Sequence, residues 1–112
     1  MTVLDLSAVL DGELLCCSEK GHDEVCDFAA SDLLSDILTF EKERYALVTG
    51  LTNAQIVRTA EITNACCVVL VRDKQPQQAA VQLAESHGIP LILSPLSMFE
   101  ACSRISAAVS KV

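Results

Sequence analysis

The stretch from Tyr45 to Arg72 reads YALVTGLTNAQIVRTAEITNACCVVLVR, and it predicts a strand, a tight turn, a helix and a second strand. The first apolar run ends at Thr49 and Gly50, and glycine permits a sharp departure from a strand because it has no Cβ. The second run, Cys66 to Val71, is apolar throughout, which is typical of a strand covered on both faces in a parallel sheet. The stretch therefore predicts one parallel βαβ unit.

The helix of this unit has two candidate starting residues. Thr52 precedes Gln55 at the spacing of a capping box, and Asn53 is the alternative N-cap. Asn64 suits the exit from the helix. Ala54, Ile56, Val57 and Ala60 recur at helical spacing and predict its buried face.

The remainder of the chain repeats or supports this unit. Before it we expect a helix over 1–11, a strand over 13–18, an extended segment over 25–30 and a helix over 31–41. After it we expect a helix over 76–87, a strand over 89–93 and a helix over 98–110. Ser31, Pro76 and Ser97 are the expected starts of three of these helices, and Phe99 is expected on a buried face. The alternation predicts an α/β fold in a single domain over 1–112, with a mostly parallel sheet and helices on both faces.

Charge and hydropathy exclude several classes of protein. The net charge of −7 and the scattered basic residues argue against a nucleic-acid partner. The longest apolar run, Ala65 to Val71, is far shorter than the roughly 20 residues of a membrane span, so no membrane association is expected. The six cysteines lie within apolar patterns and no secretory signal precedes them, which favours reduced thiols and a cytoplasmic location.

Polar residues follow the expected parallel strands. In an open α/β sheet, ligands bind outside the carboxyl ends of the strands, where helix N-termini and small hydroxyls can hold an anion. The alternative interpretation is that these residues are ordinary caps and turns. The candidate ligand-binding residues at this edge are Thr49, Gly50, Thr52, Asn53, Arg72 and Ser94.

No motif nominates a catalytic residue, a metal ligand or a cofactor. Cys66 and Arg72 have the C-x5-R spacing of a phosphatase loop, but the five residues between them are predicted to be strand and cannot wrap a phosphate. The chain has no phosphate-loop motif for ATP, and His22 and His87 lie outside any zinc-binding spacing. Asp32 and Asp36 fit the solvated first turn of a helix better than an acid/base pair.

Four segments together resemble a stand-alone DRTGG domain. They are SDLLSD from Ser31, LVTGLTNAQIVRTAE from Leu47, VVLVRDKQP from Val68 and GIPLILSPLSMFEAC from Gly88. Such domains are similar to the N-terminal domain of HPr kinase/phosphorylase, and small stand-alone members resemble proteins encoded near iron-only hydrogenases and signalling enzymes. The resemblance implies an α/β fold, a homodimer, and a regulatory or binding role without activity of its own.

Two hypotheses for function follow. The first is a non-catalytic regulatory or binding module that dimerises and binds a protein partner or a small ligand, associated with redox, hydrogenase or signalling proteins. The second is a sensor of a small anion or nucleotide, with a small phosphorylated ligand at the carboxyl ends of the strands. An enzyme is a weaker hypothesis, because no nucleophile and base are nominated together.

Overall fold

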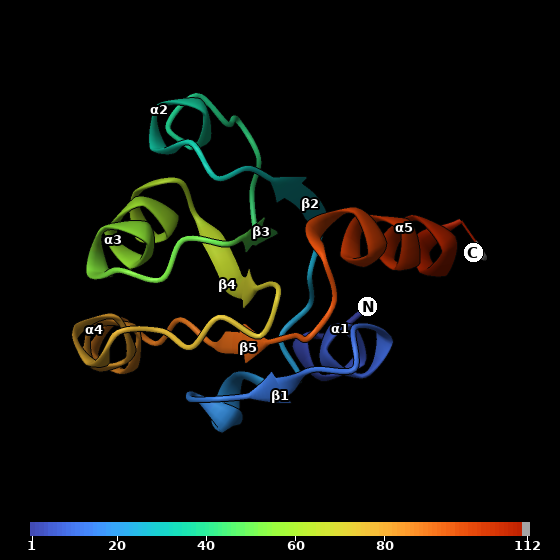
Figure 1. Ribbon diagram of the computed structural model, residues 1–112, viewed down its shortest axis with the longest axis horizontal. Helices are drawn as coiled ribbons and strands as arrows, with labels where there is room; N and C mark the ends of the chain where they lie inside the picture. The colour runs from blue at the N-terminus through green and yellow to red at the C-terminus, as the bar shows by residue number, and fades with distance from the viewer. Residues whose placement is uncertain (111–112) are drawn as a thin grey trace.

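The computed structural model describes residues 1–110, which form a five-stranded sheet between helices (Figure 1). The strands are β1 (Glu13–Leu14), β2 (Asp27–Ala30), β3 (Tyr45–Thr49), β4 (Ala65–Leu70) and β5 (Leu91–Leu93). The helices are α1 (Val3–Val9), the 3₁₀ turn η1 (Ser18–Lys20), α2 (Leu34–Ile37), α3 (Ala54–Ile62), α4 (Gln78–His87) and α5 (Met98–Val109). This alternation confirms the predicted α/β fold.

The sheet has the strand order β1-β5-β4-β3-β2. The four strands from β2 to β5 are parallel to their neighbours, and only β1, at one edge, runs antiparallel to β5. The predicted mostly parallel sheet is therefore confirmed. Because β2, β3 and β4 are parallel neighbours, the residues that follow them meet at one edge of the sheet.

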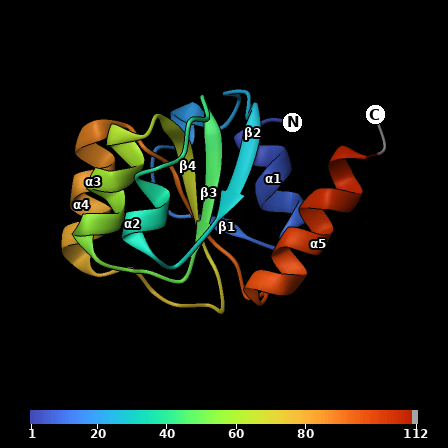
Figure 2. The same cartoon turned by 90° about the horizontal axis from the view of Figure 1, so that it is seen from above.

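Helices cover both faces of the sheet, as Figures 1 and 2 show. Successive residues of a strand point to opposite faces, so each strand supplies two separate cores. Leu47 and Leu70 pack with the core under α3 and α4, whereas Val48 and Val69 pack with the core under α1 and α5. All five residues of β3 are buried, which explains why its sequence lacks an alternating pattern.

Local capping follows the sequence at several helix ends. Thr2 and Asp5 form a capping box at α1, and the Ser97 side chain accepts the Glu100 N–H at α5. Of the two candidates for α3, the structure uses Asn53, whose side chain accepts the Ile56 N–H. These side chains satisfy amide groups that a helix start leaves without a partner.

Two predicted helix starts are wrong. The helix expected over 31–41 shrinks to α2, because the Ser31 N–H donates to Val48 O and so extends the β2–β3 pairing by one residue. The helix expected from Pro76 begins at Gln78, because Gln77 is extended and its N–H donates to Thr52 O. In both places a contact between segments displaces a locally favourable cap.

Two further expectations at the sheet and at α5 are corrected. The strand expected over 13–18 ends as β1 at Leu14, and the chain then turns through Cys17, whose φ is 59°, into η1. Phe99 is 86% exposed rather than buried. The fully covered face of α5 is formed by Ala101 and Ile105, and Phe99 lies off that face.

Candidate functional site

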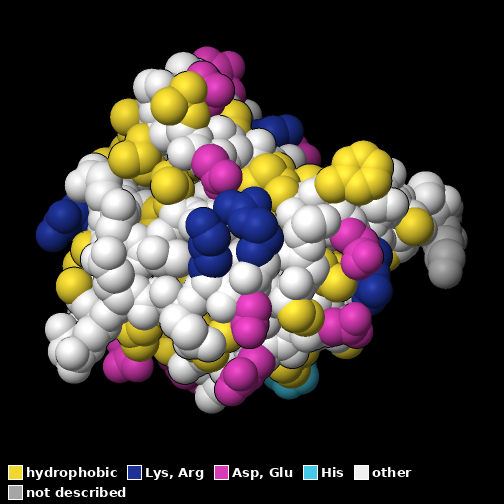
Figure 3. Space-filling model, viewed as in Figure 1, with side chains coloured by type: hydrophobic (Ala, Val, Ile, Leu, Met, Phe, Trp, Pro, Cys, Tyr) yellow, Lys and Arg dark blue, Asp and Glu magenta, His cyan; other side chains and the backbone are white. Residues whose placement is uncertain are grey.

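The carboxyl edge of the sheet brings three chain segments together. Thr49 ends β3 and Gly50 follows it. Arg72 lies two residues after β4, and Asp32 lies two residues after β2. The view of Figure 3 faces this edge and shows basic side chains gathered near its middle with an acidic side chain beside them. We call Asp32, Thr49, Gly50 and Arg72 the carboxyl-edge cluster.

Gly50 leaves room for the Arg72 side chain, which lies across it. A Cβ at Gly50 would overlap the Arg72 guanidinium group, whose Cζ would be 3.0 Å away. The φ angle of Gly50 is not in the left-handed region, so the backbone itself would accept alanine there. Glycine therefore serves here to admit a side chain rather than to make a turn.

The loop after β4 has an unusual backbone that directs Arg72. Both Arg72 (φ 59°) and Asp73 (φ 53°) lie in the left-handed region, which is uncommon for residues other than glycine. Their N–H groups donate to Leu96 O (2.7 Å) and Ser94 O (2.8 Å), so the connection after β5 holds the loop in place. Two successive residues of this kind are typical of a functional loop held by its surroundings.

The Asp32 carboxylate occupies the centre of the cluster. Its Oδ1 accepts the Gly50 N–H at 2.6 Å and the Thr49 hydroxyl at 3.2 Å, and its Oδ2 lies 3.5 Å from Arg72 Nη2. Partial burial raises the pKa of Asp32, but the Gly50 N–H, the Thr49 hydroxyl and Arg72 together outweigh it and hold the pKa below its usual value. The cluster is thus a set of donors that holds one anionic group.

The other three candidate residues have separate contacts. Ser94 is buried, and its hydroxyl donates to Leu10 O at 2.7 Å. The Asn53 side chain caps α3, and the Thr52 carbonyl accepts the Gln77 N–H. Of the six residues predicted from the sequence, the structure therefore brings Thr49, Gly50 and Arg72 together.

Asp32 is the member of the cluster that the sequence analysis did not place there. It was expected in the first turn of a helix, whereas it lies in the extended segment between β2 and α2. The available signal was positional, because Asp32 follows β2 much as Gly50 follows β3. To use this signal, one must predict that residues 25–30 form a strand parallel to β3 and next to it.

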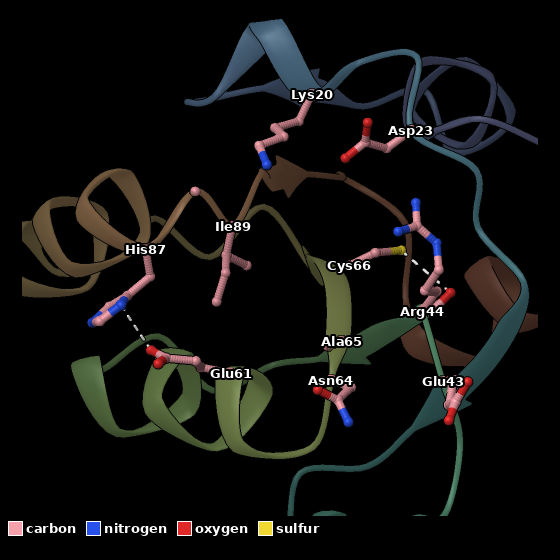
Figure 4. Close-up of a pocket in the computed structure, with 11 residues that line it drawn as sticks. Lys20, Asp23, Glu43, Arg44, Glu61, Asn64, Ala65, Cys66, His87 and Ile89 are labelled. Carbon is pink, nitrogen blue, oxygen red and sulfur yellow. Dashed lines mark hydrogen bonds and ion pairs between the residues drawn. The ribbon is translucent and has the colours of Figure 1, made fainter.

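A second concave region lies at the opposite, amino edge of the sheet, where sequence reasoning placed no site. It is a cavity of about 480 Å³ (Figure 4). Most of its lining residues lie near the starts of strands or near the carboxyl ends of α3 and α4. The lining consists of Lys20, Asp23, Glu43, Arg44, Glu61, Asn64, Ala65, Cys66, His87, Gly88 and Ile89. At one side of it, His87 Nδ1 lies 2.9 Å from Glu61 Oε2.

Cys66 is the one thiol in this cavity, which we call the amino-edge cavity. Interaction with the neighbouring Cys67 thiol and with the Arg44 charge lowers the pKa of Cys66, although partial burial opposes this. The Cys66 thiol donates to Arg44 O at 3.4 Å. The lining mixes acidic and basic side chains, so the cavity has no strong preference for one sign of charge.

An apolar groove lies between edge strand β2 and helix α5. It measures about 330 Å³ and has no charged side chain in its lining, which comprises Phe28, Ala29, Ala30, Val48, Cys102, Ile105, Ser106 and Val109. The exposed Phe99 lies one helical turn before Cys102. We call this surface the β2–α5 groove.

Other features of the described residues bear on function. All six cysteines are free thiols. Among residues 1–110, no three His, Cys, Asp or Glu side chains come together in a way that suits a metal ion. Within the same part of the chain, every helix is too short or too polar to cross a bilayer.

The chain is similar to known proteins in sequence and in fold. The family model of the DRTGG domain matches residues 5–108. The chain is also similar to a solved structure of the CBS and DRTGG domains of the regulatory region of Clostridium perfringens pyrophosphatase, complexed with its activator, diadenosine tetraphosphate. The TM-score is 0.72 at 19% identity, over 93% of this chain and 46% of that chain. At this identity the likeness shows the fold alone, and the chain spans less than half the length of that structure.

Proposed function

Because the chain belongs to the DRTGG domain family, we propose that it is a non-catalytic regulatory module that binds a small phosphorylated ligand at the carboxyl-edge cluster. The observation that carries the proposal is the convergence of the Gly50 N–H, the Thr49 hydroxyl and the Arg72 guanidinium on one anionic group. Proteins commonly bind phosphate through backbone N–H groups and guanidinium groups of this kind.

The solved relative supports a regulatory role of this kind. That structure is of a regulatory region with a nucleotide activator bound, and its DRTGG domain is similar in fold to this chain. That structure also contains CBS domains, and this chain covers 46% of it. A phosphorylated or nucleotide ligand for this chain is therefore our proposal, supported by the donor set rather than by transfer from the relative.

A non-catalytic role is supported by what surrounds the cluster. Thr49 is buried and its hydroxyl donates to Asp32, so it is not free to attack a substrate. The low pKa of Asp32 makes its carboxylate a weak base. We propose that the module works with no cofactor and in the cytoplasm.

The test is a thermal-shift screen of the reduced protein against phosphate, nucleotides and acyl phosphates. A ligand at about 100 times its Kd adds about 2.7 kcal/mol of stability, which is a rise of about 10 °C in Tm for a domain of this size. Arg72→Ala should abolish the rise, because it removes the only guanidinium of the cluster. Arg58→Ala is the matched control, since it removes the same charge from the exposed face of α3. A rise that persists in Arg72→Ala would place the ligand elsewhere.

A second candidate function is a homodimeric protein-interaction module. The observation that favours it is the uncharged β2–α5 groove beside the exposed Phe99, in a chain with a net charge of −7. Two acidic copies, or this chain and a redox, hydrogenase or signalling protein, would meet with least repulsion on such a surface. Sedimentation at high concentration tests the dimer: a single species of 12.0 kDa would contradict it.

A further inference from the structure

The place proposed for an external anion is already filled by a side chain of the protein. The Asp32 side chain makes its polar contacts with the donors of the carboxyl-edge cluster: the Gly50 N–H, the Thr49 hydroxyl and Arg72. Its own segment therefore depends on those donors for its position. A phosphate oxygen that used the same donors would meet the carboxylate at van der Waals distance and repel it.

Apart from Asp32, the segment that carries it is attached to the core through Ile37, with Leu34 and Phe40 partly buried against the same core. We call residues 31–40 the strap. Its helix α2 has only four residues, and its N-cap Leu33 has no side chain able to accept a hydrogen bond from the helix. Within that helix only Ile37 is buried, and the flanking Leu33 and Leu38 are each more than half exposed.

The strap also has two anchors that would survive loss of the carboxylate contacts. The Ser31 N–H donates to Val48 O at its start, and the Phe40 ring packs edge-on against Tyr45 at its end, with ring centroids 6.0 Å apart. Ile37 and Leu34 also pack against the core, so release of Asp32 would lower the free energy at which the short helix opens, without unfolding the sheet. Segments with few buried contacts open locally at low free energy.

We propose that Asp32 is an internal competitor of the ligand, and that a phosphorylated ligand displaces its carboxylate from the carboxyl-edge cluster and releases the strap. This inference rests on the proposed function and adds its means of signalling. The same donors hold Asp32 when the ligand is absent and the phosphate group when it is present. Occupancy of the cluster is thereby converted into a change in the surface formed by α2.

Binding of inorganic phosphate and of ADP to the full chain tests the competition, measured by calorimetry. Asp32→Ala should bind about tenfold more tightly than the natural chain, as expected when an exposed ion pair and a charged hydrogen bond no longer compete. Asp36→Ala is the matched control, because it removes an equal charge from the strap outside the cluster. Asp32→Asn keeps the shape of the side chain and should give an intermediate gain if Asp32→Ala folds poorly.

The possible results separate the two proposals. If Asp32→Ala and Asp32→Asn bind no more tightly than the natural chain, or if Asp36→Ala gains as much, the competition is refuted. In that case binding by the natural chain that is lost in Arg72→Ala leaves the proposed function standing. If neither the natural chain nor Asp32→Ala binds either probe, the proposed function fails and this inference fails with it.

Amide hydrogen exchange tests the release of the strap. Adding phosphate to the natural chain should speed exchange in residues 34–40 while exchange in β3 stays slow. In Asp32→Ala the strap should exchange fast from the start, and phosphate should change it little. Exchange in the strap that is unchanged or slowed by bound phosphate would overturn the proposed release.

Discussion

The substitution Gly50→Ala isolates the contact between Gly50 and Arg72. The φ angle of Gly50 lies outside the left-handed region, so alanine can adopt the native backbone conformation. Because alanine also has fewer conformations than glycine in the unfolded chain, the substitution by itself stabilises the fold by about 0.4–1 kcal/mol. The new Cβ, however, overlaps the guanidinium group, and Arg72 must swing away from Asp32. Losing an ion pair whose side chains are 40% and 46% exposed costs about 0.2–1 kcal/mol.

These opposing effects predict a result that depends on the background. In the natural chain the gain and the loss nearly cancel, so the free energy of unfolding should change by less than about 0.5 kcal/mol. In an Arg72→Ala background no guanidinium is displaced, and Gly50→Ala should stabilise by the full gain of about 0.4–1 kcal/mol. The difference between the two backgrounds is the coupling energy of a double-mutant cycle.

Urea unfolding of the four proteins measures this coupling. The slopes of free energy against urea concentration should agree among them, since the surface exposed on unfolding is nearly the same. An equal effect of Gly50→Ala in both backgrounds would show that Arg72 does not occupy the space above Gly50. A loss above about 2 kcal/mol in both would indicate backbone strain, which the φ angle of Gly50 argues against.

Three other substitutions or conditions have defined outcomes. Gly88→Ala, at φ 68° after α4, should destabilise by about 1–2 kcal/mol in thermal unfolding, because a Cβ is strained in the left-handed region. Asn53→Ala should lower the free energy of urea unfolding by about 1 kcal/mol through loss of the α3 cap. Asp32 has a lowered pKa when folded, so its stabilisation is complete above its unfolded pKa of about 3.9 and is lost as the pH falls through the folded pKa. The Tm difference between the natural chain and Asp32→Asn should therefore be constant from pH 5 to 7 and should shrink below about pH 4, and a constant difference would contradict this.

The parts of the fold that local sequence determines were predictable. The continuous apolar runs of β3 and β4 can only be buried on both faces, which requires a parallel sheet with two layers of helices. The caps at Thr2 and Ser97 depend on residues within three positions along the chain, and the structure uses both. These features needed no knowledge of how distant segments meet.

The errors occurred where a contact between distant segments outweighs a local preference. Ser31 and Asp32 are favourable residues for the start of a helix. Instead, the Ser31 N–H completes the pairing of β2 with β3, and the Asp32 carboxylate accepts the Gly50 N–H. The apolar pattern predicts a buried Phe99, but Ala101 and Ile105 already fill the face of α5 that meets the sheet. Local sequence patterns do not show which of two possible hydrogen-bonding or packing partners a residue has in the fold.

The carboxyl-edge cluster shows how such a choice bears on function. If Asp32 served stability alone, Asp32→Ala would lower the Tm with and without phosphate by the same amount. If it competes with a ligand, the same substitution lowers the Tm of the free protein but enlarges the rise that phosphate produces, because the vacated donors bind phosphate more tightly. The two effects have opposite signs and come from one side chain. Melting curves of the natural chain and of Asp32→Ala, each with and without phosphate and with Asp36→Ala alongside, therefore distinguish a structural carboxylate from an internal ligand.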